Sequence, residues 1–218
     1  MPDRADAVAA AAAPDRVALI RRAFRLEWAS VGWMLIEAVV AVGAGLAAGS
    51  LSLAAFGFDS VIELLSALVL IWRLHAELRL GARFPERTER LAGRIGGVLL
   101  WVLAGGIVAG SGWSLWTRHG QEFSWPGLAV TLLAMPVMYA LARGKLAVAA
   151  RLGSGALRAD AIESLTCGWL ALVVVLGLLA TRLTGAWWVD AVAALAIVGF
   201  VVREGREAWA GEACCGED

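Results

Sequence analysis

The chain has 218 residues, of which 60% are hydrophobic and only 17% charged, and its formal net charge is zero. A soluble domain of this length needs a far more polar surface, and a neutral chain lacks the excess of basic residues that nucleic-acid binding requires. The composition therefore excludes both classes and predicts an all-α integral membrane protein.

Three regions follow one another along the chain. Residues 1–20 are an alanine run with proline and aspartate that offers no packing face, so we expect a disordered cytoplasmic N-terminus there. Residues 21–207 form the predicted transmembrane domain, and residues 208–218 form a short cysteine-containing tail. The apolar segments of the domain are each long enough to cross most or all of about 30 Å of hydrocarbon as a helix. The six predicted spans are residues 27–48, 51–73, 95–116, 127–143, 157–181 and 187–203.

The basic residues orient these spans. If the N-terminus is cytoplasmic, 17 of the 19 lysines and arginines lie in inside segments, and only Arg118 and Arg182 lie outside. Cytoplasmic loops of membrane proteins carry such an excess, so both termini are predicted to be cytoplasmic and the number of spans even. The heavy use of Ala, Gly and Arg favours a GC-rich bacterial source, and therefore the bacterial inner membrane.

The second span contains "FDSVIELLSALVLIW", in which Asp59 and Glu63 stand four residues apart. A carboxylate near the middle of a bilayer costs about 2.5–3.5 kcal/mol on insertion scales, so two of them on one helix need a reason. Residues four apart lie on the same face of a helix, which lets both side chains reach one ligand.

The fifth span repeats this arrangement in "LRADAIESLTCGWLAL", where Glu163 and Cys167 are also four residues apart. The two spans are antiparallel in the predicted topology, and with some tilt Asp59, Glu63, Glu163 and Cys167 meet near the middle of the membrane. Carboxylate oxygens and a thiolate suit zinc, and the thiolate argues against magnesium or calcium. Four negative charges exceed the two of the metal, so some ligands should hold protons when the metal is absent.

Other readings of these side chains stay open. A buried carboxylate can be structural, bonded to a neighbouring serine or tryptophan, and Cys167 can be an inert apolar residue. Glu37 in the first span and Asp190 in the sixth are candidates for a proton path, with packing or capping as the alternative. Asp160 lies near the cytoplasmic mouth, where an entrance or structural role is favoured over ligation.

The tail "GEACCGED" combines Cys214 and Cys215 with acidic residues. These vicinal cysteines suit the capture of a soft metal in the cytoplasm, and they are equally compatible with an incidental or lipidated terminus.

Three segments together resemble the cation diffusion facilitator family, in particular a branch of short, six-span bacterial cation transporters without a C-terminal cytoplasmic domain. They are "GSLSLAAFGFDSVIELLSALVLIWRL", "LGSGALRADAIESLTC" and "WWVDAVAALAIVGFVVREGREAW". The family site has two residues four apart on the second helix and two on the fifth, which fall on Asp59, Glu63, Glu163 and Cys167. Family members usually have histidine and aspartate at the last two positions, so the resemblance leaves the metal preference open.

The resemblance implies a homodimer that exports divalent metals from the cytoplasm by alternating access and proton antiport. Zinc is the expected substrate, with cobalt, nickel, cadmium, manganese and iron as the other candidates. The alternative is a membrane metal sensor or partner subunit whose metal site is structural and which transports nothing. An enzyme is not expected, because no histidine lies within a span and His75 and His119 are both near membrane surfaces.

Overall fold

The computed structural model describes residues 4–80, 86–118, 120 and 122–210, and every regular element among them is an α-helix. The helices are α1 (Arg4–Ala48), α2 (Leu51–Leu80), α3 (Glu86–Thr117), α4 (Trp125–Leu152), α5 (Gly155–Thr184) and α6 (Val189–Ala210). These six helices confirm the predicted all-α fold.

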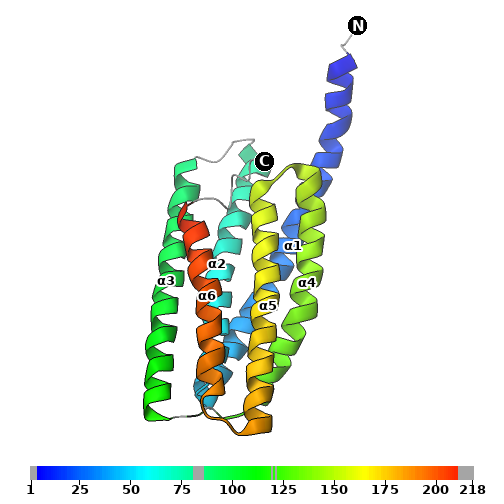
Figure 1. Cartoon of the computed structure of the whole chain (residues 1–218). Helices are drawn as coiled ribbons and strands as arrows, with labels where there is room; N and C mark the ends of the chain where they lie inside the picture. Colours follow the sequence, from blue (N-terminus) through cyan, green and yellow to red (C-terminus); the bar gives the residue numbers. More distant parts are fainter. Residues whose placement is uncertain (1–3, 81–85, 119, 121, 211–218) are drawn as a thin grey trace.

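The helices form an antiparallel bundle in which α1 begins and α6 ends at the same end of the molecule (Figure 1). Helix α1 packs most closely on α2 and α4, α3 packs on α6, and α4 packs on α5. Helices α2, α5 and α6 also contact one another, so side chains from these three elements face a common interior.

Five helices, α1 to α5, contain an apolar stretch long enough to cross a membrane. Helix α6 falls outside that group because it carries charged residues near both ends. Asp190 lies in its first turn and four charged residues lie in its last turns, so its apolar segment is shorter. The protein is therefore a six-helix membrane protein in which α6 has no apolar stretch as long as those of the other described helices.

Helix α1 begins at Arg4 and so extends over most of residues 1–20, where the sequence predicted disorder. Alanine has the highest helix propensity of all residues, so an alanine run continues a helix readily even without a packing face. The end of α4 also differs from the prediction, because the helix runs to Leu152, well beyond the predicted end of the fourth span at 143.

Glycines allow α1 and α2 to approach closely. A Cβ atom on Gly45 would lie 2.6 Å from the backbone nitrogen of Ala54, and a Cβ on Gly57 would lie 2.6 Å from that of Val42. Neither position leaves room for a side chain. The two helices therefore pack backbone against backbone, as small residues permit in membrane proteins.

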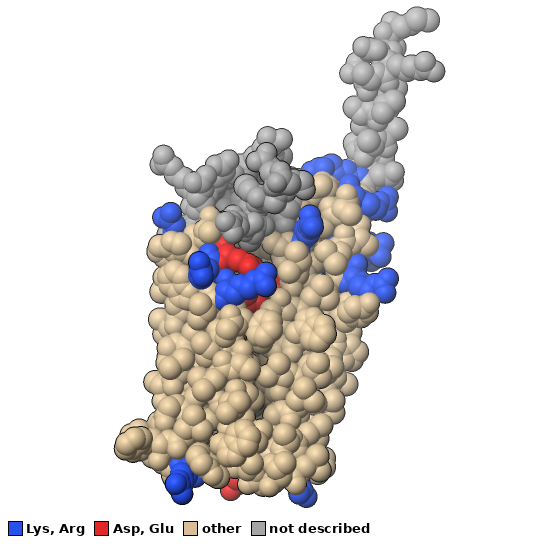
Figure 2. Space-filling view, in the orientation of Figure 1, with Lys and Arg blue, Asp and Glu red and all other residues tan. Residues whose placement is uncertain are grey.

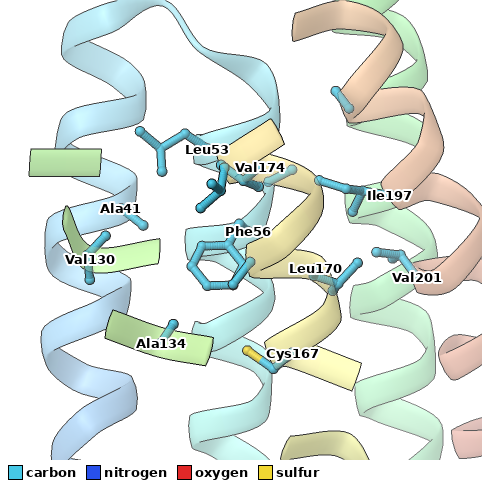
Figure 3. Packing of buried hydrophobic residues seen from close by; sticks show 14 of the residues in the cluster. Ala41, Leu53, Phe56, Val130, Ala134, Cys167, Leu170, Val174, Ile197 and Val201 are labelled. Carbon is cyan, nitrogen blue, oxygen red and sulfur yellow. The ribbon is translucent and has the colours of Figure 1, made fainter. Parts of the chain in front are cut away.

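An apolar layer fills the bundle between the acidic residues of α2 and the end at which α2 begins. Phe56 and Leu170 are fully buried in it, together with Val174 and Ile197 (Figure 3). In the predicted topology this is the outer end of the molecule. The layer lies between that end and the acidic residues, of which Asp59 follows Phe56 by about one turn of α2.

Asp190 ties the start of α6 to the start of α2. Its carboxylate accepts hydrogen bonds from Ser50 Oγ at 2.8 Å, Leu51 N at 2.7 Å, Ser52 N at 3.3 Å and Ser52 Oγ at 2.5 Å. The first N–H groups of a helix lack partners within the helix, so a carboxylate there acts as a cap. This geometry favours the capping alternative for Asp190 over a proton path.

We expect Asp190→Ala to lower the free energy of unfolding by about 1–2 kcal/mol, because it removes the cap and leaves two buried hydroxyls with fewer partners. Thermal unfolding in detergent measures the effect. Asp190→Asn, which keeps one acceptor oxygen, should lose less. Equal melting temperatures for the three proteins would show that the cap contributes nothing.

Candidate cation site

Asp59 and Glu63 lie one turn apart on α2 with their side chains inside the bundle. Asp59 is 0% exposed and Glu63 7% exposed. None of their four carboxylate oxygens has a hydrogen-bond partner among the described residues. Buried polar groups in proteins are nearly always partnered, and an unpaired buried carboxylate is strongly unfavourable. These two side chains therefore need a cation or protons that the described part of the chain does not supply.

Further carboxylates surround this pair. The Glu63 side chain interacts electrostatically with Asp59, Glu204, Glu37 and Glu163. Five acidic side chains from α1, α2, α5 and α6 thus act on one region of the interior. Such a surplus of negative charge in a low-dielectric environment attracts a cation and cannot persist fully ionised without one.

Glu37 differs from the α2 pair because donors surround it. It accepts hydrogen bonds from Trp33 Nε1 at 2.7 Å and Ser60 Oγ at 2.5 Å, and the Cys167 thiol donates to it at 3.4 Å. A structural carboxylate bonded to a neighbouring serine and tryptophan was the alternative to a ligand. Glu37 fits that alternative, whereas Asp59 does not. Glu37 also links α1 to the site by holding the thiol of α5.

The structure brings part of the predicted ligand set together. Asp59 and Glu163 interact electrostatically, and Cys167 is fully buried with its sulfur pointing into the bundle below Phe56 (Figure 3). Among the described residues, however, no three His, Cys, Asp or Glu side chains converge closely enough to hold a metal ion. The four-ligand metal site stays a prediction, because the four side chains line one region of the interior but do not converge on a single position.

A second charged cluster lies beside this region. Lys145 of α4 is fully buried and forms ion pairs with Glu27 of α1, at 3.2 Å, and with Asp160 of α5. The contact supports the structural alternative for Asp160. It also corrects the placement of Lys145, which the sequence assigned to a cytoplasmic loop, because α4 continues past it through an alanine-rich segment.

Sequence reasoning missed Glu27, Lys145 and Glu204 as interior charges. The available signal was that the chain's one lysine follows directly on an apolar span, and that Glu204 stands at the end of another. The other predicted metal-capturing residues, Cys214 and Cys215, lie outside the described residues.

Acidic side chains are visible on the surface between the upper parts of α5 and α6, where basic side chains border them (Figure 2). This is the end of the bundle at which α1 begins and α6 ends, which the topology predicts to be cytoplasmic. Acidic side chains are thus present at the surface at the end opposite the apolar layer (Figure 2).

Residues 28–209 match the cation efflux transmembrane domain. The chain belongs to the cation efflux family. This confirms the resemblance drawn from the second, fifth and sixth spans. A comparison with curated proteins found no match.

As a member of the cation efflux family, the protein carries divalent metal cations out of the cell across a membrane, and the family is one of transporters rather than enzymes. The matched segment contains the buried acids of α2 and α5 and the thiol of α5. It also contains Lys145 and Asp160 of the lysine cluster, whose third member, Glu27, lies one residue before the matched segment.

Proposed function

We propose that this cation efflux protein exports zinc from the cytoplasm in exchange for protons. Asp59 and Glu63 on α2, with Glu163 and Cys167 on α5, serve as the ligands. The observation that carries the proposal is the pair of buried carboxylates on α2 whose four oxygens have no hydrogen-bond partner among the described residues. A divalent cation supplies the positive charge that these oxygens lack.

Proton exchange follows from the same charges. Without metal, the carboxylates around Glu63 repel one another and outnumber the two basic side chains, Lys145 and Arg203, that act on Glu163 and Glu204, so protons neutralise some of them. A divalent cation replaces those protons when it binds. Protons returning from the outer side then displace the metal, which couples the two fluxes in opposite directions.

Alternating access is supported by the position of the apolar layer. The layer containing Phe56 and Leu170 separates the acids from the predicted outer end, whereas acidic side chains reach the surface at the opposite end (Figure 2). This arrangement supports an inward-facing state in the proposed cycle. Export requires a second state in which the helices rock, the apolar layer opens and the cytoplasmic end closes.

The proposed setting is a homodimer in the bacterial inner membrane. Helix α3 supports a partner surface, because large apolar side chains such as Val102 and Trp113 are 67% and 71% exposed on it. Lipid alone also covers such side chains, so the dimer rests chiefly on family membership.

The deciding experiment is metal flux in proteoliposomes with an imposed proton gradient. We expect zinc flux that needs the gradient, compared with cadmium, cobalt, nickel, manganese and ferrous iron under identical conditions. Zinc binding without flux of any metal, in folded and correctly inserted protein, would overturn the transporter proposal. It would favour a membrane sensor or partner subunit with a structural metal site.

Cys167→Ser tests whether sulfur enters the ligand set. We expect the ranking of transported metals to change, with cadmium losing most, because thiolate selects softer metals and a hydroxyl does not. The flux assay above measures the ranking. A control on the same helix is Ser164→Ala, which removes a buried hydroxyl that donates to the backbone carbonyl of Asp160 and should leave the ranking unchanged. An unaltered ranking in Cys167→Ser would assign the thiol to packing against Glu37 instead.

A further inference from the structure

Glu204 is an acidic residue in the last turns of α6 that no predicted ligand set includes. It is half-buried, and its Oε1 atom is buried without a hydrogen-bond partner among the described residues. Its carboxylate interacts electrostatically with Asp59 and Glu163 in the interior, and with Glu207 and Arg203 on its own helix. A carboxylate facing other carboxylates from the end of a third helix lowers the stability of the empty protein unless a cation binds among them.

The neighbouring acid on the same helix is in a different environment. Glu207, three residues further, accepts a hydrogen bond from Arg203 at 2.7 Å, and both side chains are largely exposed. Glu207 also interacts electrostatically with Glu163 and Glu204, but it is exposed and paired with Arg203, whereas Glu204 has a buried oxygen without a partner among the described residues. This difference makes Glu207 a matched control for Glu204.

The close packing of α6 on α3 holds Glu204 in this position. A Cβ atom on Gly97 would lie 2.7 Å from the carbonyl oxygen of Gly205, so the two backbones are in contact beside Glu204. Trp209 stacks on Trp101 of α3 at 5.5 Å between ring centroids. With this side of α6 fixed against α3, the helix presents its other contacts to α2 and α5, which carry the remaining acids.

We propose that Glu204 is a further cation-binding carboxylate of the transporter and that, with Glu163, it forms a station for the divalent cation on the cytoplasmic side of Asp59 and Glu63. The inference rests on the proposed function. Two observations carry it together: the unpartnered oxygen of Glu204, and the buried, unpartnered Glu63 carboxylate with which it interacts. Oxygen ligands from three helices then meet the cation in succession between the surface and the bundle interior.

The test is equilibrium binding of zinc to the purified full-length protein, measured by calorimetry. We expect Glu204→Gln to raise the dissociation constant about 10-fold or more, the loss typical of groups that support a metal site. Glu207→Gln should bind zinc as the unmodified protein does. In proteoliposomes, Glu204→Gln should raise the zinc concentration for half-maximal flux and leave the maximal flux nearly unchanged.

Glu204→Gln preserves size and removes a repelled charge, so we expect its melting temperature in the absence of metal to be no lower than that of the unmodified protein. Glu204→Asp, which keeps the charge, should recover part of the affinity. Zinc affinity unchanged in Glu204→Gln but lost in Asp59→Asn would overturn the role of Glu204 and leave the proposed function standing. Absence of zinc binding in the unmodified protein would overturn both.

Discussion

Asp59→Asn is expected to abolish zinc binding and zinc flux while leaving the protein at least as stable as before. The carboxylate is fully buried and neither of its oxygens has a hydrogen-bond partner among the described residues, so it contributes little to holding the bundle together. A buried polar atom without a partner costs about 1–3 kcal/mol, and a charged one costs more. Asparagine leaves a neutral polar group in the same place, so it relieves the additional cost of the charge and removes the anionic metal ligand at the same time.

Calorimetry with zinc and thermal unfolding without zinc measure the two effects separately. The matched control is Asp190→Asn, an acid of the same type that is 4% exposed and accepts four hydrogen bonds at the start of α2. It should lose stability and keep zinc binding. A large fall in the melting temperature of Asp59→Asn, with zinc affinity retained, would show instead that Asp59 is a structural carboxylate.

This opposite behaviour of two buried aspartates could not be obtained from the sequence. Helical periodicity placed Asp59 and Glu63 on one face of α2, and Glu163 and Cys167 on one face of α5, because spacing alone decides which residues share a face. The apolar runs likewise gave the six helices. What spacing does not contain is the partner across a helix interface, such as Ser50 and Ser52 for Asp190.

The lack of information on partners across helix interfaces also explains why the sequence did not reveal the surroundings of Glu37 and Glu204. The sequence suggested Glu37 as a proton path, but its environment depends on Ser60 of α2 and Cys167 of α5, which lie 23 and 130 residues away along the chain. Glu204 was passed over because it stands at the end of its span, where a charged residue usually contacts water. The packing of α6 on α3, α2 and α5 sets the surroundings of that residue, and the spacing of residues along the chain does not reveal it.

Lys145→Met is expected to have the largest effect on stability of any single substitution considered for this chain. The lysine is fully buried between Glu27 and Asp160, so it is the cation that permits two carboxylates to lie inside the bundle. Breaking a buried ion pair by removing one partner costs about 3–5 kcal/mol, because the remaining charge has no compensation. Here two carboxylates are left, and we expect a corresponding fall in the melting temperature in detergent.

The control for general loss of positive charge is Arg143→Gln on the same helix, where the side chain is exposed and its guanidinium lies 5.7 Å from the ring centroid of Tyr139. Arg143→Gln should leave the melting temperature nearly unchanged. The double variant Lys145→Met with Glu27→Gln removes one uncompensated charge and should recover part of the loss, which a purely steric effect of methionine would not do. Unchanged stability in Lys145→Met would contradict the buried pairing.

The lysine cluster also bears on transport, because Asp160 stands three residues before Glu163 on α5 and Glu163 interacts electrostatically with both Lys145 and Asp160. The ion pairs join α1, α4 and α5 beside the acidic region, and a dry, paired cluster of this kind resists separation of the three helices. We therefore expect α1, α4 and α5 to move as one unit when the bundle rocks, with α3 and α6 as the opposing unit. In the double variant Lys145→Met with Glu27→Gln, we expect the maximal zinc flux to fall by a larger factor than the affinity for zinc, each compared with the unmodified protein. The reason is that the double variant weakens the coupling between these helices and leaves the carboxylates of α2 in place.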